Sequence, residues 1–158
     1  MIYGFAFTKR NIGCQTLYSL NNLDNKYLLW GKVSIDKYCK KLLIDQPEYI
    51  LGLGQYTGRD KECIWMETEC SSRYGNNREK IKYLKIRPFF KETKLIKKSN
   101  HIGYSYCNLV SYNISKLIQE KRLKSKYTFL HIPKNMFVEI VRDEINKEVN
   151  GGITSLLT

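Results

Sequence analysis

Short apolar runs alternate along the chain with amphipathic helical patterns, and no internal repeat or low-complexity tract interrupts them. This alternation is typical of an α/β domain. Residues 2–7 and 48–54 are compact apolar runs, which predict buried strands. Less regular runs predict further strands at residues 27–33, 63–70, 101–106 and 127–131.

Apolar residues at helical spacing predict helices over residues 14–23, 34–45, 108–123 and 135–149. Ser34 is the expected N-cap of the second helix. Gly151-Gly152 is expected to end the last helix. The inward face of that helix is predicted to carry Phe137, Ile140, Val141, Ile145 and Val149.

The order of these elements predicts a single-domain three-layer α/β/α fold over residues 1–158, with a twisted, mostly parallel central sheet. A chain of 158 residues with 42% hydrophobic content can bury a core of its own. No stretch approaches the roughly 20 apolar residues that span a bilayer, and the first ten residues lack the order of a signal peptide. We therefore expect a cytoplasmic protein that does not bind membranes.

The five cysteines are odd in number and show no metal-ligand spacing, so the sequence predicts neither a disulfide framework nor a metal site, and no cofactor. Charge is uneven, because ten Lys/Arg and two acidic residues in segment 73–98 supply most of the net charge of +12. Within this segment, alternation over residues 81–86 suggests a hairpin or edge strand, and residues 93–98 suggest a helical turn. The segment reads as a basic variable insertion or a lid-like element, either a solvated surface loop or a cover whose charge would favour acidic ligands.

In an open α/β sheet, functional residues gather where strands end and helices begin. That rule selects Phe5 and Phe7 after the first strand, Gln55 after the strand at 48–54, Cys107 before a helix and His131 at the end of the last strand. One thiol and one of the two histidines are therefore expected at the same sheet edge.

Cys107 is expected at a helix N-terminus, where the helix dipole favours a thiolate and backbone N–H groups could hold an oxyanion. His131 could act as the base of a Cys–His pair, with Glu67 as the orienting acid and Glu69 as its competitor. The alternative is that Cys107 and His131 are ordinary structural residues of the core.

Four segments together resemble the pyroglutamyl-peptidase I family, also called pyrrolidone-carboxylate peptidases. The stretch 46–55, followed by Gly58-Arg59, is similar to the family's Gln-Pro-Asp, apolar strand and Gly-Gln-Ala-Gly-Gly-Arg. Residues 64–67 resemble Ile-x-x-Glu, residues 103–108 resemble Gly-Thr-Phe-Val-Cys-Asn, and residues 131–133 resemble His-Val/Ile-Pro. The four occur in the family's order, from about residue 47 to residue 133.

The resemblance implies a cysteine peptidase that removes N-terminal pyroglutamate through a thioester, with Cys107 as nucleophile, His131 as base and then acid, and Glu67 as the triad acid. It implies that Phe5, Phe7 and Gln55 bind the lactam ring and that the partners are N-terminally pyroglutamylated peptides. Association between copies of the chain is left open.

The chain also departs from the family's pattern. The segment between Glu67 and Cys107 is shorter and more basic, and Arg73 is its only loose counterpart to the family's arginine near the oxyanion site. Two alternatives therefore stand beside the peptidase: a related cysteine amidohydrolase of altered specificity, and a non-catalytic protein whose basic surface binds nucleic acid or another anionic partner.

Overall fold

The computed structural model describes residues 1–7, 10–58, 62–76 and 80–154. The helices are α1 (Ile12–Ser19), α2 (Gly31–Asp45), α3 (Tyr106–Glu120) and α4 (Val138–Thr154). The strands are β1 (Ile2–Ala6), β2 (Asn25–Leu28), β3 (Tyr49–Tyr56), β4 (Ile64–Glu67), β5 (Glu69–Ser71), β6 (Tyr83–Lys85), β7 (Ile96–Ser99) and β8 (Lys126–Pro133).

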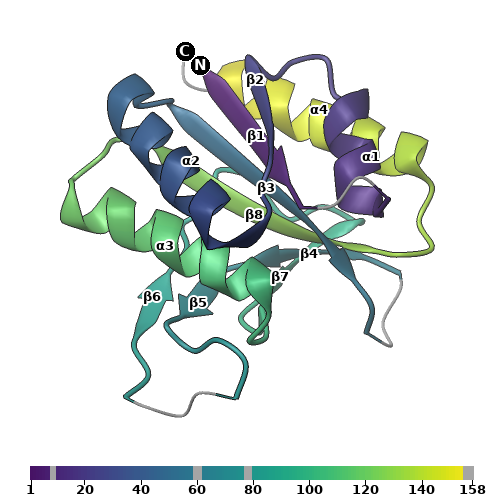
Figure 1. Cartoon of the computed structure of the whole chain (residues 1–158). Coiled ribbons are helices and arrows are strands. Elements are labelled where there is room, and N and C mark those ends of the chain that lie inside the picture. Colours follow the sequence, from purple (N-terminus) through teal and green to yellow (C-terminus); the bar gives the residue numbers. More distant parts are fainter. Residues whose placement is uncertain (8–9, 59–61, 77–79, 155–158) are drawn as a thin grey trace.

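Six strands form the central sheet in the order β2-β1-β3-β8-β4-β7, and all neighbours are parallel except β4 and β8. Helices α2 and α3 cover one face, and α1 and α4 cover the other (Figure 1). The predicted three-layer α/β/α fold with a mostly parallel sheet is thus confirmed. A separate two-stranded sheet, β5-β6, packs beneath α3.

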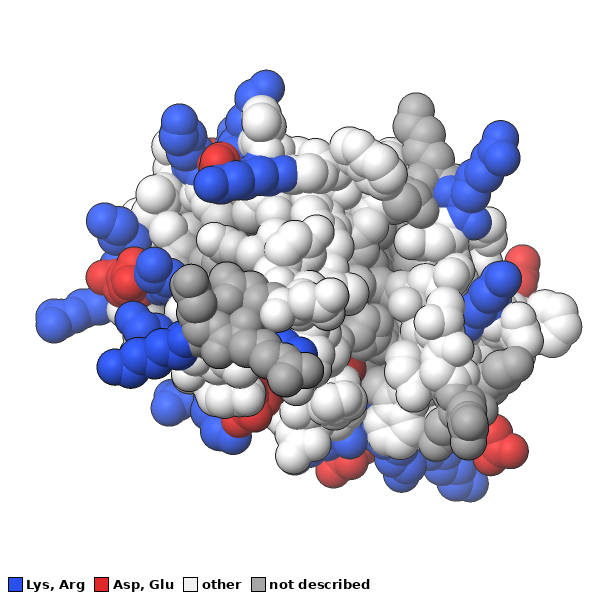
Figure 2. Space-filling view, turned by 60° about the horizontal axis from the view of Figure 1, so that its bottom comes forward, with Lys and Arg blue, Asp and Glu red and all other residues white. Residues whose placement is uncertain are grey.

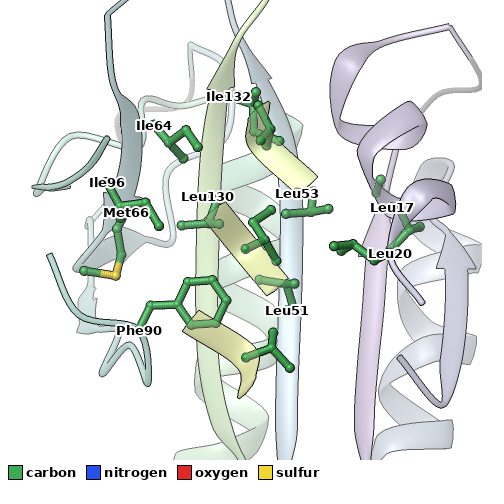
Figure 3. Packing of buried hydrophobic residues seen from close by; sticks show 14 of the residues in the cluster. Leu17, Leu20, Leu51, Leu53, Ile64, Met66, Phe90, Ile96, Leu130 and Ile132 are labelled. Atoms are coloured by element: carbon green, nitrogen blue, oxygen red, sulfur yellow. The ribbon is translucent and has the colours of Figure 1, made fainter. Parts of the chain in front are cut away.

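The core has two parts, one on each face of the sheet. On the α1/α4 face, fully buried Leu53 and Leu130 pack with Leu17 and Leu20 of α1, as Figure 3 shows. On the α2/α3 face, the centre of the core is aromatic and includes Phe5 and Phe129. Alternation along β3 explains the division, because its leucines face one layer and Gly52 and Gly54 face the other.

The second helix begins earlier than predicted. Its N-cap is Trp30 and its first residue is Gly31, which has a left-handed φ of 67°. Ser34 therefore lies inside the first turn, where its hydroxyl accepts a hydrogen bond from the Trp30 N–H. The prediction that Ser34 is the N-cap was therefore wrong. Its hydroxyl still accepts a hydrogen bond from a backbone N–H at the start of the helix, as an N-cap side chain does.

Three predictions between residues 63 and 106 were wrong. Residues 63–70 form two short strands, β4 and β5, that belong to different sheets. Residues 93–98 form a turn and the start of β7, because buried Ile96 pairs with Ile64 in the central sheet. Residues 101–106 contain no strand; Gly103 has a left-handed φ of 81° and α3 starts at Tyr106.

Only some of the residues predicted to form the inward face of the last helix are buried. Val141, Ile145 and Val149 are buried, but Ile140 is half exposed and Phe137 precedes the helix and is 71% exposed. The buried positions are four residues apart and face α1, so residues on the neighbouring stripe turn to solvent. The helix also continues through Gly151-Gly152 to Thr154.

The basic segment 73–98 is distributed over several parts of the fold. Its described residues include β6, the buried side chains of Ile86 and Phe90, and part of β7. Arg78 of this segment, like Arg59 of the Gly58-Arg59 motif, lies outside the described residues. Figure 2 shows Lys and Arg side chains around the margins of one face of the molecule. Among the described helices, none is both long enough and apolar enough to cross a membrane.

Candidate active site

Cys107 is the second residue of α3, so its thiol lies in the first turn of the helix. The N-cap residue, Ser105, makes no side-chain hydrogen bond to the helix. The first backbone N–H groups of an α-helix have no partner within the helix, and together they carry a partial positive charge. The Cys107 side chain is therefore placed where a thiolate or an oxyanion is stabilised.

His131 lies near the end of β8 and is hydrogen-bonded to a carboxylate on the neighbouring strand. Its Nδ1 is 2.8 Å from Glu67 Oε1, and both residues are buried, at 6% and 1% exposed. The second oxygen, Glu67 Oε2, has no hydrogen-bond partner among the described residues. A buried carboxylate held by one imidazole is most stable when that imidazole carries a proton.

The other partner of His131 is the Cys107 side chain, with which it also forms a hydrogen bond. Burial alone would lower the pKa of His131, but the hydrogen bonds with Cys107 and Glu67 outweigh burial and raise it to about 9. The imidazole therefore holds its proton more tightly than an imidazole in water does. The side chains of Cys107 (α3), His131 (β8) and Glu67 (β4) are therefore linked in one hydrogen-bonded series.

Gly54 of β3 leaves the space in which the thiol and the imidazole meet. A Cβ atom at this position would lie 3.1 Å from Cys107 Sγ, 3.1 Å from His131 Cδ2 and 2.9 Å from Phe129 Cζ. These distances are shorter than ordinary carbon contacts. In the sequence, Gly54 is the last residue of the predicted strand at 48–54, although glycine at alternate positions of an apolar run can also indicate a close approach.

Aromatic side chains line the sheet face beside the thiol. Phe7 contacts Tyr106 and Phe129, with ring centroids 5.4 and 6.1 Å apart. Phe5 is completely buried behind them and contacts both Phe7 and Phe129. Of the two predicted phenylalanines, Phe7 is thus the one next to α3, and Phe5 supports it from the core.

Gln55 lies near the carboxyl end of β3, at the same end of the sheet as His131, but its side chain does not approach those of Cys107, His131 and Glu67. It follows Gly54 on β3, and Ile132 is its partner on β8. Because side chains alternate along a strand, the Gln55 side chain lies on the opposite face of the sheet from His131 and Cys107. Its backbone remains beside the site.

Asn108, which follows Cys107, connects the helix start to β5 and to Arg73. Fully buried, it accepts from the Ser71 N–H and donates to the carbonyl oxygens of Ser71 and Arg73. The Arg73 guanidinium stacks over Tyr104, 3.7 Å from the ring centroid. No role was predicted for Asn108 from the sequence, and a polar residue on the buried side of a helical pattern was the signal that could have indicated one.

Within the described part of the chain, no group of three or more His, Cys, Asp or Glu side chains is arranged to hold a metal ion. What the fold and the site define is a three-layer α/β/α domain in which a helix-start thiol, a buried imidazole and a buried carboxylate are hydrogen-bonded in series.

Comparison with solved structures finds this fold in pyroglutamyl peptidases. The chain is similar to pyroglutamyl peptidase I from Bacillus amyloliquefaciens, with a TM-score of 0.76 at 14% sequence identity over 93% of this chain and 91% of that one. It is also similar to the pyrrolidone carboxyl peptidases of Thermococcus litoralis (TM-score 0.73, 13% identity, 98% and 94% covered) and Thermus thermophilus (0.71, 16%, 94% and 98%). No family model and no curated protein sequence matches the chain.

Proposed function

We propose that the chain is a cysteine peptidase that removes N-terminal pyroglutamate from peptides. The observation that carries the proposal is the hydrogen-bonded series Glu67–His131–Cys107, with the thiol in the first turn of a helix. The fold shared with pyroglutamyl peptidases and the resemblance of the four sequence segments support the substrate class.

The raised pKa of His131 favours an imidazolium before substrate binds, and Cys107 reacts as the thiolate, which is the nucleophilic form of a thiol. The thiolate attacks the carbonyl carbon of the pyroglutamyl residue and forms a C–S bond, and the carbonyl oxygen becomes an oxyanion. The free N–H groups in the first turn of α3 stabilise this oxyanion. His131 then donates its proton to the leaving amine, the C–N bond breaks, and a thioester remains.

Water completes the cycle. The imidazole, now neutral, takes a proton from a water molecule that attacks the thioester, and the C–S bond breaks to release pyroglutamic acid. The proton taken from water returns His131 to the imidazolium, and Cys107 Sγ is free for the next cycle. Glu67 keeps Nδ1 protonated and fixes the ring so that Nε2 faces the reacting atoms.

The lactam ring is expected to lie on the aromatic side chains next to the thiol. Phe7 and Tyr106 supply an apolar surface there, with Phe5 and Phe129 behind it. A flat, uncharged ring is suited to such a surface, whereas the charged side chain of an open glutamate is not. The Gln55 backbone is the polar group at the same strand end.

The decisive experiment is hydrolysis of pyroglutamyl-aminomethylcoumarin, with prolyl-aminomethylcoumarin as the substrate that lacks the lactam carbonyl. Cys107→Ala should lower kcat at least about a thousandfold, because the residue forms the covalent bond. Cys39→Ala is the matched control, since Cys39 is a partly buried helical cysteine whose pKa is raised by burial and by Asp36 to about 11. It should retain full activity.

Undiminished turnover by Cys107→Ala would overturn the nucleophile assignment. Failure of the unaltered chain to hydrolyse the pyroglutamyl substrate, with Cys107 still alkylated rapidly at neutral pH, would retain the thiolate and reject the proposed specificity.

A further inference from the structure

A groove of about 580 Å³ lies away from the thiol, beneath the second half of α3. One wall is the continuous run from Tyr83 to Arg87, which includes β6, and the other is formed by α3 and the start of β8. The first helical residue in the groove is Ser115, eight residues after Cys107 and therefore about 12 Å along the helix axis. The groove is thus separate from the candidate active site.

Strand β6 has one paired edge and one open edge. Its inner edge pairs with β5. Just beyond the two ends of this pair, Ile86 N–H donates to Thr68 O and Ser72 N–H donates to Lys82 O. In an antiparallel pair the hydrogen-bonding groups of alternate residues point in opposite directions. The backbone groups of Tyr83, Lys85 and Arg87 therefore point outward, and within the described part of the chain no other strand pairs with them.

The open edge is strongly basic. Residues 80–87 contain four cationic side chains and no acidic one. Lys85 is neutralised in part by Glu69, with Nζ 2.6 Å from Oε2, but Arg87 and Lys126, which face the groove from opposite walls, form no ion pair with any described residue. An occupant with carboxylates would therefore gain charge pairs on both sides.

The groove also offers apolar surface beneath the edge. Ile86 and Tyr127 are nearly fully buried in its floor, and Ile118 and Leu123 line it from the α3 side. A strand added to β6 would turn every second side chain toward this floor and the others toward solvent and the basic residues. Alternating apolar and acidic residues fit this arrangement.

We propose that the outer edge of β6 and the groove beside it bind an extended acidic peptide segment, which adds as a third strand to the β5-β6 sheet. Main-chain hydrogen bonds to Tyr83, Lys85 and Arg87 supply the register, and the basic walls select acidic partners. A second copy of this chain is a poor occupant, because pairing β6 with itself would bring Lys85 and its basic neighbours together across the ladder.

The test uses a labelled peptide of alternating glutamate and valine, with a lysine–valine peptide as the charge control. Fluorescence anisotropy should show binding of the acidic peptide alone, weakening as salt rises. Amide hydrogen exchange should show new protection at Tyr83, Lys85 and Arg87, while the inner amides, already paired with β5, change little. Protection of every second amide along β6 is the pattern expected when a strand adds to its outer edge.

Lys85→Pro and Lys85→Gln form a matched pair of variants. Both remove the side-chain charge and the ion pair with Glu69, but only proline removes the outward N–H, and the inner ladder to β5 does not use that group. The Lys85→Pro chain should bind at least about fivefold more weakly than Lys85→Gln. Hydrolysis at Cys107 should be the same in both, so the outcome is independent of the proposed function.

Three results would overturn the proposal. Equal affinity of the two variants, or uniform rather than alternate protection, would reject strand addition. Displacement of the peptide by single-stranded oligothymidylate at lower concentration would assign the surface to nucleic acid. Self-association of the free protein that protects the same three amides would assign the edge to a second copy of the chain.

Discussion

At His131, burial and hydrogen bonding act against each other. An imidazole that is 6% exposed would normally lose its proton more readily than one in water. The carboxylate at 2.8 Å and the thiol on its other side reverse that tendency. The charge state of the site thus depends on two partners that are far apart in sequence.

Replacement of Glu67 by Gln should lower the pKa of His131 from its raised value of about 9 by at least about one unit, because the amide keeps a hydrogen-bond acceptor but removes the negative charge. NMR titration of the imidazole Cε1–H measures it directly. In a His101→Gln background, His131 is the only histidine signal, since the chain has two histidines. An unchanged midpoint would mean that the carboxylate does not set the charge of the ring.

At the level of elements, strand β3 shapes the site although it contributes no reacting group. Gly52 and Gly54 face the aromatic layer, and the missing side chains let Phe5, Phe129, Cys107 and His131 approach the strand. The leucines on the other face keep the strand anchored in the core. One face of β3 is therefore anchored by its own side chains, and the other leaves room for side chains from neighbouring elements.

Gly54→Ala should test this role. The added methyl group must displace the thiol, the imidazole or the Phe129 ring, which should lower kcat/KM for the pyroglutamyl substrate by about a hundredfold and stability by about 1–3 kcal/mol. Steady-state kinetics and thermal unfolding measure the two effects. Gly151→Ala is the matched control, because a Cβ there meets no atom within 4 Å. If the two variants behave alike, the space at Gly54 is not needed.

The elements also show how far the sequence could predict this molecule. The strands at 2–7 and 48–54 and helix α3 follow local periodicity, and they were predicted nearly in place. Strand β7 and the break at Thr68 were not, because both depend on partners distant in sequence. Ile96 pairs with Ile64, and Thr68 donates to the Ser99 carbonyl oxygen and accepts from the Ile86 N–H. The Glu67–His131 hydrogen bond could be expected from motif order, whereas Asn108 and Gly54 became informative only through their neighbours.

For the whole molecule, the charge on His131 links stability to pH. Its pKa is about 9 in the fold and about 6.5 in an unfolded chain, so the folded state binds the proton more tightly. The resulting stabilisation is complete below about pH 6.5, decreases as pH rises, and is lost above about pH 9.

In a Cys107→Ser background, which removes the titrating thiol, the free energy of unfolding measured in urea should fall between pH 6 and pH 9, because Glu67 still raises the pKa of His131. Adding His131→Gln to this background should give a clearly smaller slope over the same range, because the remaining groups are shared by both proteins. Parallel slopes would contradict the linkage, whatever the difference in absolute stability.

The position of β8 in the sheet has a consequence for biosynthesis. Among the strands that the structure describes, β8 comes last in the sequence, yet it lies between β3 and β4 and alone joins the β2-β1-β3 and β4-β7 parts of the sheet. A nascent chain that ends before Lys126 can assemble two separate half-sheets, each with an unpaired inner edge. On the ribosome, Cys107 and Glu67 therefore emerge before β8, the strand that carries His131 between them. A chain released early would expose unpaired strand edges that promote aggregation and would have no activity.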